Sequence, residues 1–287
     1  MNYKTMLFIP GNNPGMLMSM DVLGADAYIV DLEDAVSLDN KDAARDMAVS
    51  YLNTFAGDKP YDIFVRINPP DTPFFEKDVK ALKQTKIEGL MLAKADTENI
   101  EILDKKLDGT DLKIFALIET ASSLELSYFV LSKVKRTVGV LLGAEDLTLD
   151  LGAKRTKESK EIEYARAKIV ASAKAAGVQA VDTPWTDTDD MEGLKLDTLK
   201  AKEIGMTGKA LISPRHVDVV NEVFAPTKED INHALRVFKA LEQAKKEGKG
   251  AFSLDGKMVD KPIILRATDV LKQSGEFTEA MNELITK

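Results

Sequence analysis

Residues 113–119 read KIFALIE and residues 138–146 read VGVLLGAED, two apolar runs that each end on carboxylates. Uninterrupted apolar runs of this kind are typical of strands that are buried on both faces of a parallel sheet. We therefore expect Glu119, Glu145 and Asp146 where the carboxyl ends of the strands meet solvent. Several carboxylates at one such edge repel each other unless a cation neutralises them, and a divalent metal is the simplest candidate.

Further apolar runs recur along the chain between amphipathic stretches, as expected of parallel βα units. Residues 41–55 and 161–176 have helical patterns, and the second ends before Gly177, a residue type that commonly follows a helix. Eight strands with intervening helices predict the α/β class and a closed (β/α)8 TIM barrel, whose functional residues gather at the carboxyl ends of the strands. The expected strands are residues 6–9, 27–32, 63–67, 89–94, 113–119, 137–143, 178–183 and 208–212.

The alternative architecture is an open, doubly wound sheet. Length does not decide between the two, because 287 residues suit one large barrel or two ordinary domains. A doubly wound nucleotide-binding sheet should carry a glycine-rich phosphate turn after its first strand, and residues 10–15, PGNNPG, lack the G-x-G-x-x-G spacing. The barrel is therefore favoured.

The chain continues beyond the eighth strand. Residues 228–246 form a strong helical pattern, opened by Thr227 with Asp230 three positions later and closed by Gly248. The Asp-Gly step at positions 255–256 predicts a tight hairpin turn. We expect a barrel over residues 1–225 that carries the active site. Residues 226–287 would form a C-terminal helical and hairpin extension that covers a site, its own or a neighbouring subunit's.

Composition excludes several functional classes. The chain has 47 Asp and Glu against 39 Lys and Arg, a net charge of −8, which argues against nucleic-acid binding. It has no cysteine, so disulfides, thiolate catalysis and cysteine-bound zinc are excluded. No apolar run approaches the roughly 20 residues of a membrane helix, and the amino terminus lacks a signal-peptide pattern, so we expect a cytoplasmic protein with no membrane partner.

The expected strand ends carry a mixture of acids and bases that an ordinary solvated rim does not explain. Magnesium prefers a few carboxylates, water and an oxygen-rich ligand, which suits Glu119 and Asp146 as its two protein ligands. Arg66 and Lys94 would then hold a substrate carboxylate, which the planar fork of arginine matches bidentately. We predict an anionic α-keto or hydroxy acid as the substrate. The other polar residues expected at this edge are Asp31, Glu33, Asp34, Asn68, Asp96, Glu145, Asp182 and Trp185.

Three further features have both a functional and an ordinary interpretation. Residues 12–15 could present backbone N–H groups to an anion or form a simple loop. We expect His216 to have a capping or surface role. The basic run at residues 154–157, KRTK, lies after the sixth strand and could meet a phosphorylated arm or be solvated.

Five motifs follow one another along the chain: MLFIPGN at 6–12, VDLEDAV at 30–36, VRIN at 65–68, IE at 118–119 and LGAED at 142–146. Together they resemble the HpcH/HpaI aldolase and citrate lyase superfamily. Two further stretches, GKALISPR with APT at positions 225–227, and DGKMVDKP, are similar to its branch that cleaves citryl thioesters. The resemblance covers nearly the whole chain. It implies a magnesium-dependent barrel enzyme that is usually trimeric.

The resemblance also implies roles for individual residues. Glu119 and Asp146 hold the metal, Arg66 grips the substrate carboxylate, and Asp260 reaches the site of a neighbouring subunit. Asp34 stands where related pyruvate aldolases carry a histidine, so their base is not transferred to this chain. Lys4 and Ala93 replace the usual arginine and proline of the family. The expected substrate contacts are Arg66, Gly143, Ala144, Glu145, Lys94, Lys4 and Asp34, with Glu145 also shaping the loop beside the metal ligands.

The chemistry expected from this resemblance is retro-Claisen cleavage of a citryl thioester into oxaloacetate and an acetyl thioester. Asp260 would protonate the departing enolate, which requires a carboxyl pKa raised by burial. The thioester would be carried by an acyl carrier protein or by coenzyme A. The partners would be the transferase (α) and acyl-carrier (γ) subunits of a citrate lyase, with residues 154–157 meeting the acidic carrier.

Three alternatives remain at this point. The same residues would serve a lyase for malyl-CoA or citramalyl-CoA, and only a substrate comparison separates these from a citryl lyase. A noncatalytic docking subunit is a second alternative, and it predicts no activity and no magnesium binding. A phosphate-dependent barrel isomerase would need glycine-rich loops after the last two strands, which residues 183–185 and 213–214 do not supply.

Overall fold

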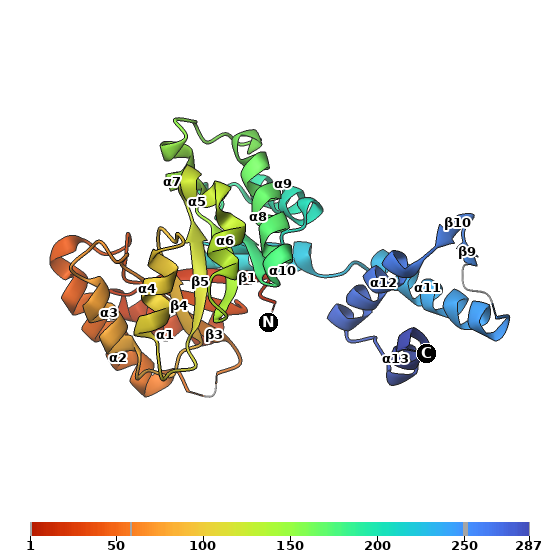
Figure 1. Ribbon diagram of the computed structural model, residues 1–287, viewed down its shortest axis with the longest axis horizontal. Helices are drawn as coiled ribbons and strands as arrows, with labels where there is room; N and C mark the ends of the chain where they lie inside the picture. Colours follow the sequence, from red (N-terminus) through yellow and green to blue (C-terminus); the bar gives the residue numbers. More distant parts are fainter. Residues whose placement is uncertain (1, 58, 249–251, 287) are drawn as a thin grey trace. The chain divides into compact units, whose positions relative to one another are not determined.

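The computed structural model describes residues 2–57, 59–248 and 252–286. The chain divides into two compact units, Met1–Phe224 and Ala225–Lys287, so the division lies one residue before the boundary expected from the sequence. Figure 1 shows the elements of both units. Among the described residues, no helix combines the length and apolar character needed to cross a membrane.

The first unit is a closed barrel of eight parallel strands, with β8 pairing back onto β1 through Met6 and Ala210. This confirms the predicted (β/α)8 architecture, and each observed strand lies within two residues of its expected bounds. Parallel apolar strands can be buried on both faces because helices cover the outer face. The strands are β1 (Thr5–Pro10), β2 (Ala27–Asp31), β3 (Asp62–Ile67), β4 (Gly89–Leu92), β5 (Lys113–Ile118), β6 (Thr137–Leu142), β7 (Gln179–Asp182) and β8 (Gly208–Leu211).

Helices connect successive strands and surround the barrel (Figure 1). The helix predicted at residues 41–55 is observed as α2. The helix predicted at residues 161–176 begins at Glu163, after a 3-10 turn, and ends at Ala176. Gly177 follows it with a φ of 74°, the left-handed conformation that is common after a helix. The helices are α1 (Pro14–Ser19), α2 (Lys41–Phe55), α3 (Phe75–Leu82), α4 (Asn99–Lys106), α5 (Ala121–Glu125), α6 (Ser127–Ser132), α7 (Ala144–Asp150), α8 (Glu163–Ala176), α9 (Met191–Ile204) and α10 (Val217–Phe224), with 3-10 turns η1 (Met20–Val22), η2 (Leu38–Asn40), η3 (Lys160–Ile162) and η4 (Pro214–His216).

Side chains fill the barrel interior, so the barrel is a packed core with function left to its rim. Phe64 and Phe115 meet edge to face there, with ring centroids 5.4 Å apart. Gly139 on β6 is required by this packing, because a β-carbon at that position would overlap the Phe115 ring. A second apolar layer lies between the outer faces of the strands and the helices.

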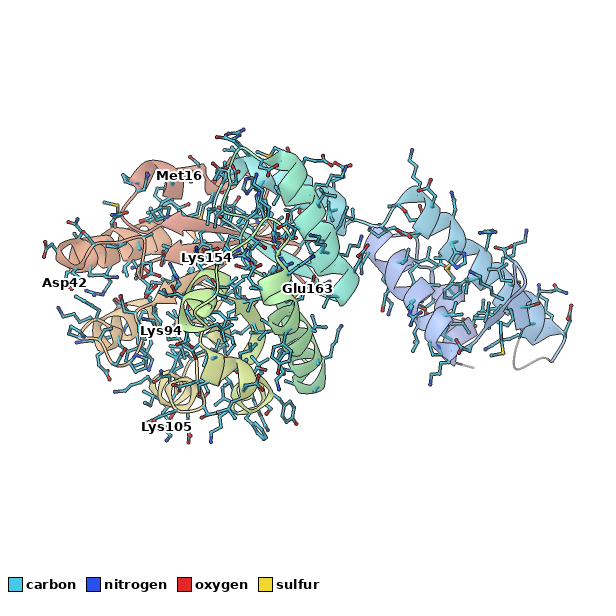
Figure 2. The ribbon with its side chains drawn as sticks, turned by 90° about the horizontal axis from the view of Figure 1, so that it is seen from above. Met16, Asp42, Lys94, Lys105, Lys154 and Glu163 are labelled. Carbon is cyan, nitrogen blue, oxygen red and sulfur yellow. The ribbon has the colours of Figure 1, made fainter. Side chains whose placement is uncertain are left out.

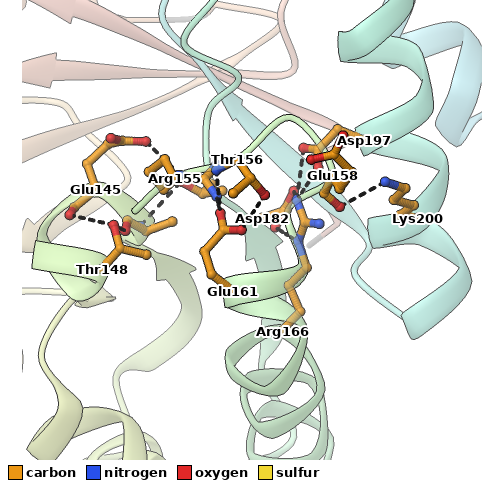
Figure 3. Close-up of polar contacts among 12 residues, drawn as sticks. Glu145, Thr148, Arg155, Thr156, Glu158, Glu161, Arg166, Asp182, Asp197 and Lys200 are labelled. Carbon is orange, nitrogen blue, oxygen red and sulfur yellow. Dashed lines mark hydrogen bonds and ion pairs between the residues drawn. The ribbon is translucent and has the colours of Figure 1, made fainter. Parts of the chain in front are cut away.

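A fully buried ionic cluster fastens α8 and α9 to the barrel wall. Arg166 Nε donates to Asp182 at 2.8 Å and its Nη2 lies 2.8 Å from Asp197. Lys209 on β8 lies 2.6 Å from Asp182 and 2.7 Å from Asp197, so two cations balance two anions. Figure 3 shows Arg166 between the two aspartates. The prediction that Asp182 lies on the solvated rim is therefore wrong, because its side chain points away from the barrel axis into this cluster.

The second unit consists of helices and one hairpin around its own apolar core, which includes Val237, Phe238 and Leu271. Thr227 and Asp230 form a reciprocal capping box at the start of the predicted long helix. The predicted Asp-Gly turn is also present, with φ of 53° and 77° at positions 255 and 256. The elements are α11 (Lys228–Lys246), β9 (Phe252–Leu254), β10 (Lys257–Val259), α12 (Lys261–Ser274) and α13 (Glu279–Thr286).

Candidate active site

A cavity of about 410 Å³ lies at the carboxyl ends of the barrel strands. Apolar side chains such as Phe8, Leu117 and Leu141 form much of its wall, and charged groups project among them. A mostly apolar pocket with a few polar groups is the usual form of a small-molecule site. The sequence-predicted residues that line it are Asp34, Arg66, Glu119, Gly143, Ala144, Glu145 and Asp146.

Glu119 follows β5 and is held by the main chain. Its residue is only 4% exposed, and Oε1 accepts a 2.6 Å hydrogen bond from the Lys94 N–H. Burial raises the pKa of Glu119 to about 7, and the nearby negative charge of Asp146 adds to the rise. Gly143 makes room for this side chain, because a β-carbon there would lie 2.9 Å from Glu119 Oε2.

Asp146 lies in the first turn of α7 and is partly exposed to the cavity. Its carboxylate forms no hydrogen bond or ion pair with any other residue that the structure describes. Glu119 and Asp146 therefore offer oxygen atoms to the same cavity without a protein cation between them, which suits a hard divalent ion. Within the described part of the chain, no group of three or more His, Asp or Glu residues is arranged to hold a metal, so such an ion would need further ligands from substrate or water.

Arg66 on β3 lies beside Asp31 on β2, its register partner. Its Nε and Nη2 donate to the two oxygens of Asp31 at 2.8 and 2.6 Å, and its Nη1 lies 3.1 Å from Glu33 and 3.6 Å from Asp34. Burial disfavours the charged guanidinium, but the bonds to Asp31 outweigh it and raise the pKa of Arg66. The prediction that the Arg66 guanidinium is free to bind a carboxylate bidentately is thus corrected. Asp31 occupies its Nε–Nη2 edge, and Nη1 lies nearest Glu33 and Asp34.

Asp31 also fixes the loop that follows β2. Its carboxylate oxygens accept hydrogen bonds from the N–H groups of Glu33 and Ala35, at 2.9 and 3.1 Å. The buried ammonium of Lys41 donates to the carbonyls of Leu32 and Glu33. Burial raises the pKa of Glu33 to about 7. The sequence analysis expected Asp31 and Glu33 at the strand end but assigned them no role. The pairing of Asp31 with Arg66 depends on the register between β2 and β3, which the sequence of a single strand does not reveal.

Two predicted lysine contacts need correction. Lys4 precedes β1, at the amino ends of the strands, where its N–H donates to Asp26 at 2.6 Å. It therefore lies at the end of the barrel opposite the cavity. The Lys94 side chain, which is labelled in Figure 2, is exposed and is absent from the cavity wall. This residue therefore reaches the site through its backbone N–H alone.

Asp260 belongs to the C-terminal unit and caps α12. Its side chain accepts a hydrogen bond from the Ile263 N–H at 3.3 Å and is exposed. The burial expected of a proton donor is therefore absent in the single chain. A buried environment for Asp260 would require contact with another surface.

Glu145 and the basic run after α7 are joined by ion pairs. Arg155 Nε lies 2.9 Å from Glu145 Oε1, and Arg155 Nη1 is paired with Glu161. Lys157 Nζ lies 3.0 Å from Asp190. Figure 3 shows Arg155 between Glu145 and Glu161. Two of the three cations in residues 154–157 are thus paired with nearby acids, and contact between this run and an acidic carrier stays a prediction.

The structure also shows the surroundings of His216, Trp185 and Asn13. His216 is fully buried, with Nε2 3.4 Å from the Thr188 carbonyl, so the expected capping or surface role is wrong. Trp185 is buried beneath the rim. Asn13 caps α1 through the Met16 N–H, in agreement with the ordinary interpretation of residues 12–15.

The chain is similar to known proteins over most of its length. Residues 4–214 match the family model described as HpcH/HpaI aldolase/citrate lyase. The citrate lyase subunit beta of Leuconostoc mesenteroides subsp. cremoris is 39% identical over 279 residues, 94% of this chain and 92% of that protein. The mitochondrial citramalyl-CoA lyase of Homo sapiens is 31% identical, with 96% of this chain and 86% of that protein covered. CitE from Mycobacterium tuberculosis, solved with magnesium, acetoacetate and coenzyme A, has a TM-score of 0.80 at 30% identity and covers 96% of this chain and 99% of its own.

Proposed function

The chain belongs to the HpcH/HpaI aldolase/citrate lyase family, and from this premise we propose that it is a carbon–carbon lyase that cleaves a citryl thioester into oxaloacetate and an acetyl thioester. The observation that carries the proposal is the placement of Glu119, Asp146 and Arg66 around one cavity. Two acids without a protein cation and one clamped arginine suit an oxygen-rich, anionic substrate. The similarity to the citrate lyase subunit beta of Leuconostoc mesenteroides subsp. cremoris covers 94% of the chain.

Magnesium is the proposed cofactor, held by Glu119 and Asp146. The fit rests on Oε2 of Glu119 and the carboxylate of Asp146, which have no hydrogen-bond partner among the described residues, and on Gly143, whose missing side chain leaves Oε2 clear. When bound, the ion would polarise the oxygen on the carbon that is cleaved and offset developing negative charge. The CitE structure with magnesium and acetoacetate supports this choice of ion.

Arg66 would orient the carboxylate end of the substrate. Asp31 holds the guanidinium in one plane, so little side-chain freedom remains to be lost on binding. During cleavage the substrate hydroxyl loses its proton and becomes the ketone of oxaloacetate. The electron pair of the broken C–C bond passes to the acetyl fragment, which takes up a proton. We assign that proton to Asp260 of a neighbouring subunit.

The carrier of the thioester is the finer part of the proposal. We propose an acyl carrier protein within a citrate lyase, with α and γ subunits as partners, since a citrate lyase β subunit is a relative at 39% identity. The citramalyl-CoA lyase relative supports a second candidate, cleavage of citramalyl-CoA. Purified protein should be assayed with magnesium on citryl and (S)-citramalyl thioesters, each attached to carrier protein and to coenzyme A. Faster cleavage of citramalyl-CoA would favour the second candidate.

We further propose that the enzyme is a homotrimer. Exposed apolar side chains support association, because Phe129 on α6 is 60% exposed and Leu149 on α7 is 79% exposed. Light scattering coupled to size exclusion should give three times the mass of the chain. A monomer at assay concentration would contradict a site shared between subunits.

A further inference from the structure

Lys94 has a backbone conformation that lysine rarely adopts. Its φ is 50°, in the left-handed region, where a side chain is sterically disfavoured. Among the described residues only Ser159 and Asp255 share this property without being glycine. Such conformations persist where surrounding structure enforces them, and they gather at functional sites.

The left-handed turn ends β4 early. The sequence predicts a strand up to position 94, but β4 ends at Leu92. The chain pairs with β5 again at Ala95, whose N–H donates to the Leu117 carbonyl at 3.0 Å. The irregular segment therefore spans two residues, and its effect is to turn one N–H group, that of Lys94, toward Glu119.

That N–H group determines how Glu119 presents its two oxygens. Oε1 accepts the 2.6 Å hydrogen bond from Lys94, while Oε2 lies over Gly143 with no hydrogen-bond partner among the described residues. A carboxylate fixed through one oxygen offers the other in a defined direction. We propose that the backbone of Lys94, and not its ammonium group, is a positioning element for Glu119 as a metal ligand. This inference rests on the proposed function, because it presumes that Glu119 binds a divalent cation.

The side chain offers a rival explanation. If the ammonium of Lys94 mattered, every substitution that removes it would weaken the site equally. If the backbone matters, the outcome depends on how readily the new residue adopts φ near 50°. Glycine does so freely, alanine less readily, and valine least, because its branched β-carbon crowds the backbone.

The test compares Lys94→Gly, Lys94→Ala and Lys94→Val by isothermal titration with Mg²⁺, in the full chain. We expect Lys94→Gly to bind as tightly as the native chain and Lys94→Val to bind about 10- to 100-fold more weakly, the usual effect of losing a partner that orients a ligand. Lys94→Ala should lie between them. Should Lys94→Val fail to fold, the Mg²⁺ affinities of Lys94→Gly and Lys94→Ala still test the inference, because the glycine variant should bind more tightly.

Asp255→Val is the matched control, since it imposes the same conflict at φ 53° on the hairpin of the C-terminal unit. It should leave Mg²⁺ affinity unchanged. Equal weakening in all three Lys94 variants would assign the effect to the ammonium and overturn the inference, as would unchanged affinity in all three. A native chain that binds no Mg²⁺ would instead refute the proposed metal site, and the inference with it.

Discussion

Asp31 and Arg66 are register partners on adjacent strands, and the carboxylate of Asp31 holds the guanidinium of Arg66 through two hydrogen bonds of 2.8 and 2.6 Å. Such a bidentate pair fixes the plane of the arginine. Asp31 shares its oxygens with two backbone N–H groups, so its own position is also fixed. The arginine that we propose to bind substrate is thus held in place by the sheet.

Replacing Asp31 should impair substrate orientation more than folding of the barrel. Asp31→Asn keeps the shape but removes the charge and one acceptor, so Arg66 gains freedom and its carboxylate contact is less well aimed. We expect kcat/KM to fall by about 100-fold, the scale seen when positioning is lost, with the circular dichroism spectrum unchanged. Asp39→Asn is the control, since Asp39 is exposed on the turn η2 and is absent from the cavity wall. An equal loss in both variants would contradict the special role of Asp31.

Magnesium should stabilise the native chain against unfolding. A ligand that binds only the folded state at 100 times its dissociation constant adds about 2.7 kcal/mol. Asp146→Asn should abolish the rise in thermal midpoint that Mg²⁺ produces. Glu145→Gln, one position earlier, should retain it, because Glu145 is paired with Arg155. Loss of the Mg²⁺ effect in Glu145→Gln would add Glu145 to the proposed metal ligands.

The fold was largely predictable, because eight apolar runs with helical stretches between them leave few alternatives to a barrel. The pairing of individual side chains around the site was not predictable. Strands that are apolar on both faces lack the alternation that would show which way Asp182 points, and it proves to face the helices. Lys4 was assigned through the family resemblance, although it precedes the strand expected at residues 6–9 and so belongs at the amino end of that strand. Lys94 was assigned by residue type, and its left-handed backbone follows from three-dimensional pairing.

Stability without divalent metal should fall as pH rises through the range in which Glu33 and Glu119 lose their protons. Burial raises the pKa of both from the usual 4.5 to about 7. Between these values the folded state binds protons that the unfolded state has released, so the free energy of unfolding decreases with rising pH and levels off above about 7.

Urea titrations in EDTA at pH 5 and pH 8 would measure this decrease. Glu33→Gln should reduce it by on the order of 2 kcal/mol, since one pKa unit corresponds to about 1.4 kcal/mol. Asp39→Asn, on the exposed turn η2, should leave it as in the native chain. A decrease that is unchanged in Glu33→Gln would show that Glu33 does not hold a proton in the folded state.

Gly143 should tolerate no side chain. A β-carbon there would lie 2.7 Å from Glu119 Cβ and 2.9 Å from Oε2, so Gly143→Ala must displace the Glu119 side chain. We expect a loss of about 1 to 3 kcal/mol in stability, as for other overpacked sites, together with weaker Mg²⁺ binding by calorimetry. Gly15→Ala serves as the control, because its β-carbon would meet only Asn13 at an ordinary 3.5 Å. Native Mg²⁺ affinity in Gly143→Ala would mean that Glu119 is not a ligand.

A site shared between subunits predicts complementation. Asp260→Asn keeps a good cap for α12, since asparagine caps helices as well as aspartate does, but it cannot donate a carboxyl proton. Arg66→Ala retains Asp260 and loses the substrate clamp. Each variant alone should be inactive, yet mixed oligomers would pair an intact barrel from the Asp260→Asn chain with an intact acid from the Arg66→Ala chain.

The two variants should therefore be unfolded together, refolded together and assayed on the citryl thioester, with each refolded alone as the control. Partial recovery of activity is expected only after mixing. A double variant that carries both changes should rescue neither single variant, because it contributes neither an intact Arg66 nor an intact Asp260 to the mixed oligomer. Inactive mixtures that form oligomers normally would place Asp260 at the site of its own chain, while full activity of Asp260→Asn alone would remove it from the mechanism.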